Sequence, residues 1–186
     1  MKMEPKTSSV FRIVFLGGPG VGKTSIIQRC VYNEFKEKSS PTVEDMYFYK
    51  LNLPDGQCGR FEVVDTSGLL EFSAMIDLRI SQAQALVVVY AINNERSFLL
   101  AKSLCERIRQ IKGRDFQHIL LVGNKLDRTD RKVSTVSACR FVGWQPKCLL
   151  VESSARYDLN IKAIFNILLD SLSTCDADAQ INREIT

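Results

Sequence analysis

A glycine-rich segment that directly follows an apolar run constrains this sequence most strongly. Residues 17–24 read Gly-Gly-Pro-Gly-Val-Gly-Lys-Thr, and residues 11–16 before them read Phe-Arg-Ile-Val-Phe-Leu. The pattern G-x-x-x-x-G-K-[ST] between a buried strand and a helix binds phosphate, because successive backbone N–H groups and the positive end of the helix surround the anion. The residues expected to bind phosphate are Gly17, Gly18, Pro19, Gly20, Val21, Gly22, Lys23, Thr24 and Ser25.

Two side chains of this loop have an expected chemical role. Lys23 can reach the β- and γ-phosphates of a nucleotide, and the hydroxyl of Thr24 can ligate Mg²⁺. Glycines are needed around them because a Cβ would block the close approach of the backbone to phosphate. The alternative is a turn that is glycine-rich by chance, which the preceding strand disfavours.

Composition narrows the class of protein. The 186 residues suffice for one domain with a substantial core, and 45% hydrophobic and 25% charged residues are ordinary for a soluble globular protein. The net charge of +4 is too small and too scattered to favour a nucleic acid partner. Six cysteines without C-x-x-C spacing, with a single histidine, disfavour a zinc site and indicate reduced thiols in the cytosol.

Both ends of the sequence lack lipidation patterns. It starts Met-Lys and ends Arg-Glu-Ile-Thr, so neither N-myristoylation nor C-terminal prenylation is expected. The sequence also lacks a signal peptide and an apolar stretch of transmembrane length. We therefore expect a cytoplasmic monomer, and the C-terminus does not support peripheral membrane association.

Apolar runs that alternate with helical patterns predict a three-layer α/β fold with a mostly parallel sheet. Residues 85–92 are apolar on both faces, as in a central strand, and the turn signal at 53–56 predicts an antiparallel hairpin. The expected strands are 11–17, 46–53, 60–65, 85–92, 118–123 and 148–152.

Helical periodicity appears between these strands. Residues 23–34 follow the phosphate-binding loop, residues 97–112 carry an apolar stripe that Gly113 can end, and Asn160 can cap a last helix. The apolar pattern fades after residue 174. We expect a flexible N-terminus at 1–10, one folded domain at 11–174 and a flexible tail at 175–186.

Another motif, Asp-Thr-Ser-Gly at 65–68, follows a predicted strand, where an open α/β sheet places its ligand. Asp65 can hold Mg²⁺, directly or through water, and Gly68 can bring a backbone N–H to the γ-phosphate. Taken alone, this motif is weak, because such loops also occur by chance.

Two motifs at later strand ends indicate the base. Residues 124–127 read Asn-Lys-Leu-Asp, and the carboxylate of Asp127 can accept two N–H bonds that guanine offers and adenine lacks. This disfavours an ATPase or a kinase. Residues 153–156 read Ser-Ser-Ala-Arg, small enough for a backbone N–H to approach the guanine carbonyl. An ordinary strand-end turn is the alternative for each motif alone. The expected base-binding residues are Asn124, Lys125, Asp127, Ser154, Ala155 and Arg156.

Together the four motifs resemble those of the small GTPases over residues 11–172. Residues 41–45, which read Pro-Thr-Val-Glu-Asp, are similar to the Ras-type effector segment. Residues 65–68 with the later Ala74, Met75 and Ile80 are similar to the Dexras/Rhes and Di-Ras branches. The resemblance implies a GTPase domain: a six-stranded, mostly parallel sheet with one antiparallel hairpin, flanked by five helices.

The resemblance also implies roles for individual residues. Thr42 would ligate Mg²⁺ and contact the γ-phosphate. Phe35 would pack on the guanine ring; the alternative interpretation is that Phe35 is a hydrophobic residue that closes the first helix. The implied catalytic residues are Lys23, Thr42 and Gly68, the metal ligands Thr24, Thr42 and Asp65, and the effector-binding residues Pro41, Thr42, Val43, Glu44, Asp45 and Tyr47.

The family further implies a two-state switch. Loops 36–45 and 66–78 would be ordered by the γ-phosphate and released after hydrolysis. Effector proteins would bind through 39–47 and 66–78, and an exchange factor and a GTPase-activating protein would be further partners.

Two departures from the family pattern bear on catalysis. Leu69 stands where most Ras-like proteins carry the glutamine that orients the attacking water. Glu71 nearby is an alternative that could substitute for the glutamine, although its charge would oppose the γ-phosphate. Pro19 adds a ring where an arginine finger would enter. We therefore hypothesise a Mg²⁺-dependent GTPase with slow intrinsic hydrolysis. The alternatives are a GTP-loaded binding module that recruits effectors and a lineage that positions water differently.

Overall fold

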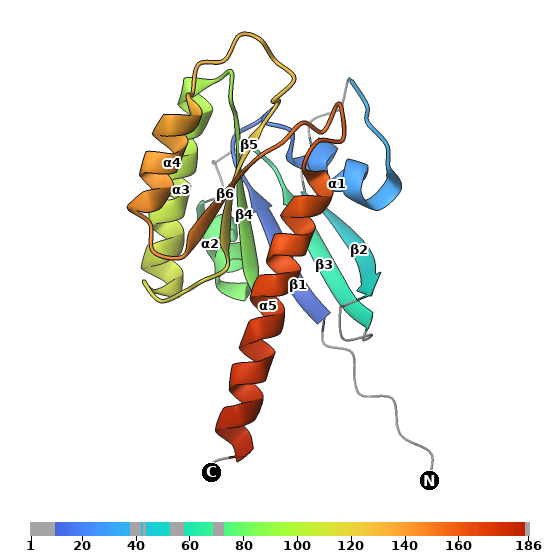
Figure 1. Cartoon of the computed structure of the whole chain (residues 1–186), viewed down its shortest axis with the longest axis vertical. Coiled ribbons are helices and arrows are strands. Elements are labelled where there is room, and N and C mark those ends of the chain that lie inside the picture. The colour runs from blue at the N-terminus through green and yellow to red at the C-terminus, as the bar shows by residue number, and fades with distance from the viewer. Residues whose placement is uncertain (1–9, 38–41, 43, 53–57, 69–72, 185–186) are drawn as a thin grey trace.

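The computed structural model describes residues 10–37, 42, 44–52, 58–68 and 73–184 (Figure 1). Within these ranges the chain forms one six-stranded sheet with the order β2-β3-β1-β4-β5-β6. All neighbouring strands are parallel except β2 and β3, which pair antiparallel as predicted. The strands are β1 Val10–Leu16, β2 Glu44–Asn52, β3 Cys58–Thr66, β4 Ala85–Ala91, β5 Ile119–Asn124 and β6 Cys148–Glu152.

Five helices of the described part of the chain cover the sheet, with α1 and α5 on one face and α2, α3 and α4 on the other (Figure 1). This arrangement confirms the predicted three-layer fold. None of the helices in these ranges is both long and apolar enough to cross a membrane. The helices are α1 Lys23–Tyr32, α2 Ser73–Gln82, α3 Glu95–Lys112, α4 Thr135–Gly143 and α5 Ile161–Glu184.

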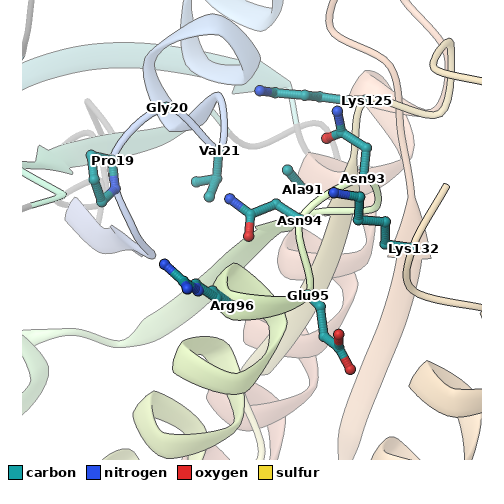
Figure 2. Close-up of a pocket in the computed structure, with 10 residues that line it drawn as sticks. All are labelled: Pro19, Gly20, Val21, Ala91, Asn93, Asn94, Glu95, Arg96, Lys125 and Lys132. Atoms are coloured by element: carbon teal, nitrogen blue, oxygen red, sulfur yellow. The ribbon is translucent and has the colours of Figure 1, made fainter. Parts of the chain in front are cut away.

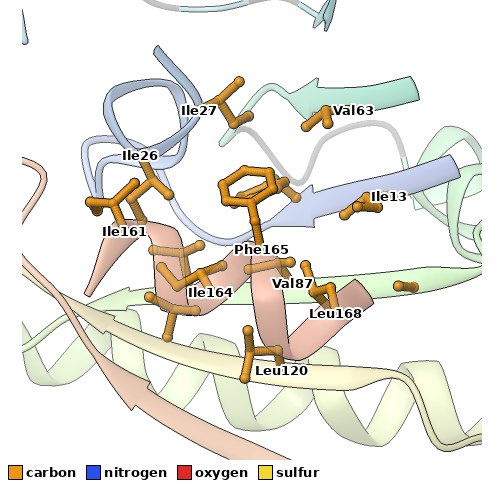
Figure 3. Close-up of a cluster of buried hydrophobic side chains, with 14 of the residues drawn as sticks. Ile13, Ile26, Ile27, Val63, Val87, Leu120, Ile161, Ile164, Phe165 and Leu168 are labelled. Atoms are coloured by element: carbon orange, nitrogen blue, oxygen red, sulfur yellow. The ribbon is translucent and has the colours of Figure 1, made fainter. Parts of the chain in front are cut away.

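The core on the α1 and α5 face fixes the start of the phosphate-binding loop. Every residue of β4 is buried, because helices cover both of its sides. Phe165 of α5 lies beside Ile26 of α1 and Val87 of β4, and its ring centroid is 6.0 Å from that of Phe15 in β1 (Figure 3). Since β1 and α1 both pack into this cluster, the loop that connects them has two rigid ends.

Two helix boundaries differ from the prediction for local reasons. α3 begins at Glu95 rather than at residue 97, because the side chain of Asn94 accepts a hydrogen bond from the N–H of Ser97 at 3.2 Å and caps the helix. α1 ends at Tyr32, before the predicted residue 34, because Asn33 adopts a left-handed conformation with φ of 56°. Gly113 ends α3 as predicted.

The last helix differs more. It begins directly after Asn160, but the Asn160 side chain donates to the carbonyl of Glu152 at 2.8 Å, so it is engaged with the preceding strand. α5 continues to Glu184, past residue 174, where the apolar pattern of the sequence fades. The domain end at residue 174 and the flexible tail at 175–186 stay predictions. Once the turns through Leu172 are anchored, each added residue gains a backbone hydrogen bond, and no glycine or proline interrupts 173–184.

Truncation of Phe165 tests the importance of this cluster. Phe165 is 3% exposed, so Phe165→Ala should lower the free energy of unfolding by about 3–5 kcal/mol, through lost burial and the cavity left behind. Phe48→Ala is the matched control, because Phe48 is 74% exposed and its loss should change stability by less than about 0.5 kcal/mol. Urea unfolding measures both; equal losses would contradict the placement of Phe165.

Candidate functional site

The phosphate-binding loop, residues 17–24, packs directly on its neighbours at two glycines. A Cβ on Gly17, whose φ is +144°, would lie 2.2 Å from the carbonyl oxygen of Val89 in β4. A Cβ on Gly22, whose φ is +100°, would lie 2.2 Å from the side-chain nitrogen of Asn124. Neither position accepts a side chain without displacing backbone or a buried amide. The packing of the loop on its neighbours therefore requires glycine at these two positions of the sequence motif.

The loop is folded around its lysine. The ammonium of Lys23 donates to the carbonyl oxygens of Gly17 at 2.9 Å and Gly18 at 3.2 Å, and the side chain is buried. Burial lowers the pKa of Lys23, and the charge of Asp65 partly offsets this effect. The loop thus holds a desolvated cation, which is suited to a strongly anionic ligand.

Three oxygen-bearing side chains from separate segments meet beside this lysine. The hydroxyl of Thr24 donates to one carboxylate oxygen of Asp65 at 2.5 Å and lies 3.0 Å from the hydroxyl of Thr42. The other carboxylate oxygen of Asp65 is buried and has no hydrogen-bond partner among the described residues. Burial raises the pKa of Asp65 to about 6. A buried, unpartnered carboxylate oxygen next to two hydroxyls suits a hard cation that takes oxygen ligands.

The segment that follows Asp65 reaches the phosphate-binding loop. A Cβ on Gly68 would lie 2.2 Å from the backbone nitrogen of Pro19, so Gly68 and Pro19 are in direct backbone contact. The predicted neighbours of this contact, Leu69 and Glu71, lie outside the described residues, as do Ser39, Ser40, Pro41 and Val43 of the other predicted switch loop.

Asn124, the first residue of the third motif, connects the phosphate-binding loop with the fourth motif at residues 153–156. Its amide nitrogen donates to the carbonyl of Val21 at 2.9 Å. Its amide oxygen accepts from the N–H of Ala155 at 3.3 Å and from the hydroxyl of Ser153 at 3.4 Å. The side chain is 2% exposed, so water cannot hydrogen-bond to its amide, and these protein partners satisfy it instead.

A second polar pair orients the carboxylate predicted to select the base. The hydroxyl of Ser154 donates to Asp127 at 2.6 Å and accepts from the N–H of Tyr157 at 3.2 Å. Lys125, between the two motif side chains, adopts a positive φ of 71°. Its pKa is lowered chiefly by burial and further by the charge of Arg128. The backbone at residues 124–127 therefore turns so that an amide and a carboxylate serve different neighbours.

These segments enclose a cavity of about 600 Å³. Phe35 lines it and also packs, partly buried, against the core. Sequence reasoning missed Lys36, Glu37, Asn93 and Arg128, none of which belongs to a motif. The lining residues are Gly20, Ser25, Phe35, Lys36, Glu37, Asn93, Asn124, Lys125, Asp127, Arg128, Ala155 and Arg156.

A second cavity of about 520 Å³ shares Gly20, Asn93 and Lys125 with the first (Figure 2). Figure 2 shows the phosphate-binding loop on one side and residues that follow β4 on the other, with Arg96 at the start of α3 directed toward the loop. Sequence reasoning missed this wall too, although the end of β4 lies at the same sheet edge as the motifs.

The predicted effector segment begins the edge strand β2. Arg79 of α2 donates to both carboxylate oxygens of Glu44, one of them at 3.1 Å. Asp45 next to it is exposed, and the ring of Tyr47 packs edge-on against Tyr32 at 6.2 Å between centroids. The two carboxylates of this segment therefore differ in their surroundings: Glu44 is paired with Arg79, whereas Asp45 is exposed to solvent.

Comparisons with known proteins agree with the motifs. The model of the Ras family matches residues 12–174. The mouse GTP-binding protein Di-Ras1 is 36% identical over 166 residues, which cover 89% of this chain and 83% of that protein. Mouse GTP-binding protein Di-Ras2 is 35% identical over 168 residues, with 89% and 83% covered. GTP-binding protein drn-1 of Caenorhabditis elegans is 32% identical over 170 residues, with 90% and 78% covered.

Removal of the Asn124 side chain tests the bridge between the phosphate-binding loop and the fourth motif, residues 153–156. Asn124→Ala leaves the carbonyl of Val21 and the N–H of Ala155 without their partner, so the free energy of unfolding should fall by about 2–4 kcal/mol. The control is Asn93→Ala, which removes one exposed 3.3 Å bond to Asp130 and should cost less than about 1 kcal/mol. Urea unfolding without added nucleotide compares them, and similar losses would argue against the bridge.

Proposed function

The chain belongs to the Ras family of small GTPases, and we propose that it binds GTP and GDP with Mg²⁺ as a two-state signalling switch whose intrinsic hydrolysis is slow. The observation that carries this proposal is the cavity of about 600 Å³ in which the phosphate-binding loop, Asp127 and Ala155 meet. The family supplies the GTPase activity, and the residues of this cavity supply the proposed recognition.

At the base end, Asp127 would accept the ring imino and exocyclic amino hydrogens of guanine. Its hydrogen bond from Ser154 at 2.6 Å holds the carboxylate in one orientation before a base enters. Phe35 and Lys125 line the same cavity, and their apolar surfaces suit the two faces of a planar ring. A base without the paired donors would leave a desolvated carboxylate unmatched, which costs about 1–3 kcal/mol or more.

At the phosphate end, Lys23 would exchange its carbonyl partners for β- and γ-phosphate oxygens. Thr24, Thr42 and Asp65 would hold Mg²⁺, because they gather hydroxyl oxygens and a buried carboxylate oxygen without a partner in the described part of the chain. When bound, Mg²⁺ neutralises charge that develops on the phosphates during transfer. Gly68 would present its N–H to the γ-phosphate from beside Pro19.

Hydrolysis requires a water molecule aligned with the γ-phosphate, and the chain offers few groups for this. Lys23, Thr42 and Gly68 would stabilise the transferred phosphoryl group, but Leu69 cannot hydrogen-bond the attacking water. The ring of Pro19 lies against Gly68, where an activating protein would insert an arginine. Both features favour slow turnover and a weak response to Ras-type activating proteins.

A second candidate function is a GTP-loaded module that recruits effectors with little or no hydrolysis. Leu69 and Pro19 favour it, and the nucleotide-binding residues are the same in both cases. Effectors would bind through 39–47 and 66–78, and exchange factors or activating proteins would adjust the nucleotide state of a cytoplasmic monomer. The rate of hydrolysis separates the two candidates.

Substitution of Asp127 tests base selection. Asp127→Asn should weaken GDP binding about 100-fold or more, because an amide cannot accept both guanine hydrogens. The same variant should gain affinity for xanthosine diphosphate, whose base has a carbonyl where guanine has the exocyclic amino group. Asp115→Asn, an exposed acid outside the cavity, should leave both affinities unchanged. Fluorescence titration measures them; a normal GDP affinity of Asp127→Asn would refute the assignment.

Single-turnover hydrolysis tests the role of residue 69. Leu69→Gln should hydrolyse bound GTP about 10²-fold faster or more than the unsubstituted protein, because the glutamine can orient water. The neighbouring Leu70→Gln is the control for a general effect of polarity and should not accelerate the reaction. Phosphate release in the presence of Mg²⁺ measures the rate.

The unsubstituted protein decides between the two candidate functions in the same experiment. Bound GTP after purification with no measurable phosphate release would favour the GTP-loaded module. Bound GDP with measurable release favours the switch. A rate equal to that of Leu69→Gln would show that water is positioned without a glutamine and would contradict slow hydrolysis.

A further inference from the structure

Arg29 belongs to none of the sequence motifs, yet its guanidinium contacts segments on both sides of the cavity of about 600 Å³, which is called the guanine cavity from here on. On one side, its Nε donates to the carbonyl of Ala155 at 3.0 Å and its Nη2 to that of Arg156 at 3.2 Å. On the other side, its Nη1 donates to the carbonyl of Asn33 at 3.0 Å, and its Cζ lies 5.9 Å from the ring centroid of Phe35.

These contacts join two segments that are distant in the sequence. Asn33 ends α1 in a left-handed conformation and directs the chain toward Phe35. Ala155 and Arg156 follow β6, and together with Phe35 they line the cavity. Because one planar group holds both segments, their separation across the cavity depends on its length and geometry.

We infer that Arg29 is a positioning residue that sets the width of the guanine cavity and thereby slows nucleotide release. It acts through Phe35 and the 155–156 backbone and touches no part of the nucleotide itself. The inference rests on the proposed function, since it requires that the base enters this cavity.

The chemistry of arginine explains why this position needs that side chain. A guanidinium carries five N–H donors in a fixed plane, so it can serve three carbonyls at once while its face contacts an aromatic ring. Lysine keeps the charge and its attraction to the ring, but its ammonium cannot reach carbonyls on both sides in the same geometry. Glutamine keeps a donor and loses the charge.

Arg109 provides a matched control within the same chain. Its guanidinium also donates to three backbone carbonyls, those of Arg114 at 3.1 Å, Phe116 and Pro146. None of these residues lines the guanine cavity. Arg109→Gln therefore removes a similar set of bonds from the fold without altering the cavity.

Release of a fluorescent GDP analogue, chased with excess GDP, tests the inference. Arg29→Gln should release it about tenfold to 100-fold faster than the unsubstituted protein, as expected when one to two charge-assisted bonds are lost. Arg29→Lys should lie between the two, and Arg109→Gln should release at the unsubstituted rate. The acceleration should persist when EDTA removes divalent cations, because Arg29 acts at the base end and not at the phosphates.

A double-mutant cycle with Phe35→Leu separates positioning from a general loss of stability. If Arg29 acts through Phe35, the release rate of the double variant should be less than the product of the two single effects. Should Arg29→Gln fail to fold, Arg29→Lys takes its place in the cycle. Fully multiplicative effects, or equal acceleration by Arg109→Gln, would overturn the inference.

The outcome also distinguishes this inference from the proposed function. Retention of GDP by the unsubstituted protein, with release from Arg29→Gln at the same rate, would refute the role of Arg29 alone. Failure of the unsubstituted protein to retain GDP would refute guanine binding in this cavity, and the inference with it.

Discussion

The buried amide of Asn124 is the interaction on which the arrangement of the site depends. It takes a carbonyl of the phosphate-binding loop on one side and an N–H of the 153–156 segment on the other. The carboxyl ends of parallel strands bring these segments to one edge of the sheet, but the strands alone do not fix the distance between the loops that follow them. A short side chain with one donor and one acceptor then fixes their separation. The same contact explains why residue 22 is a glycine, since any Cβ at that position would collide with the Asn124 amide.

Charge is distributed along the site so that each end prefers a different part of a ligand. Lys23 is buried among neutral carbonyls, and burial lowers its pKa. Asp65 is buried beside hydroxyls, and burial raises its pKa to about 6. Each group is unfavourable in its charged form when only the protein surrounds it, so an anion at Lys23 and a cation at Asp65 would each relieve a cost already built into the fold. Ligand binding of this kind stabilises the folded state through mass action.

Much of this could be predicted from the sequence, because local physics and the sheet edge agree. The residue types alone predict that residues 85–91 are buried on both faces of the sheet. They also predict that residue 22 must be a glycine. Helix ends were less predictable: the cap by Asn94 and the continuation of α5 depend on single hydrogen bonds and on helix propagation past the core. Arg29 could not be identified from the sequence pattern, because what places an arginine between two loops 120 or more residues apart is tertiary contact and not spacing.

The ion pair between Glu44 and Arg79 extends the same logic to the proposed switch. Glu44 lies on β2 in the predicted effector segment, and Arg79 lies on α2 directly after the predicted second switch loop. Their side chains are 22–25% exposed, so the pair is partly desolvated, and removal of one partner would leave the other poorly matched. An effector that uses the Glu44 carboxylate must therefore accommodate Arg79 as well. Asp65 on β3 lies opposite Asp45 of β2 and accepts a hydrogen bond from Thr24, whose hydroxyl in turn contacts that of Thr42. The phosphate end of the site and the strand that carries Glu44 are therefore connected through β3, without a separate relay.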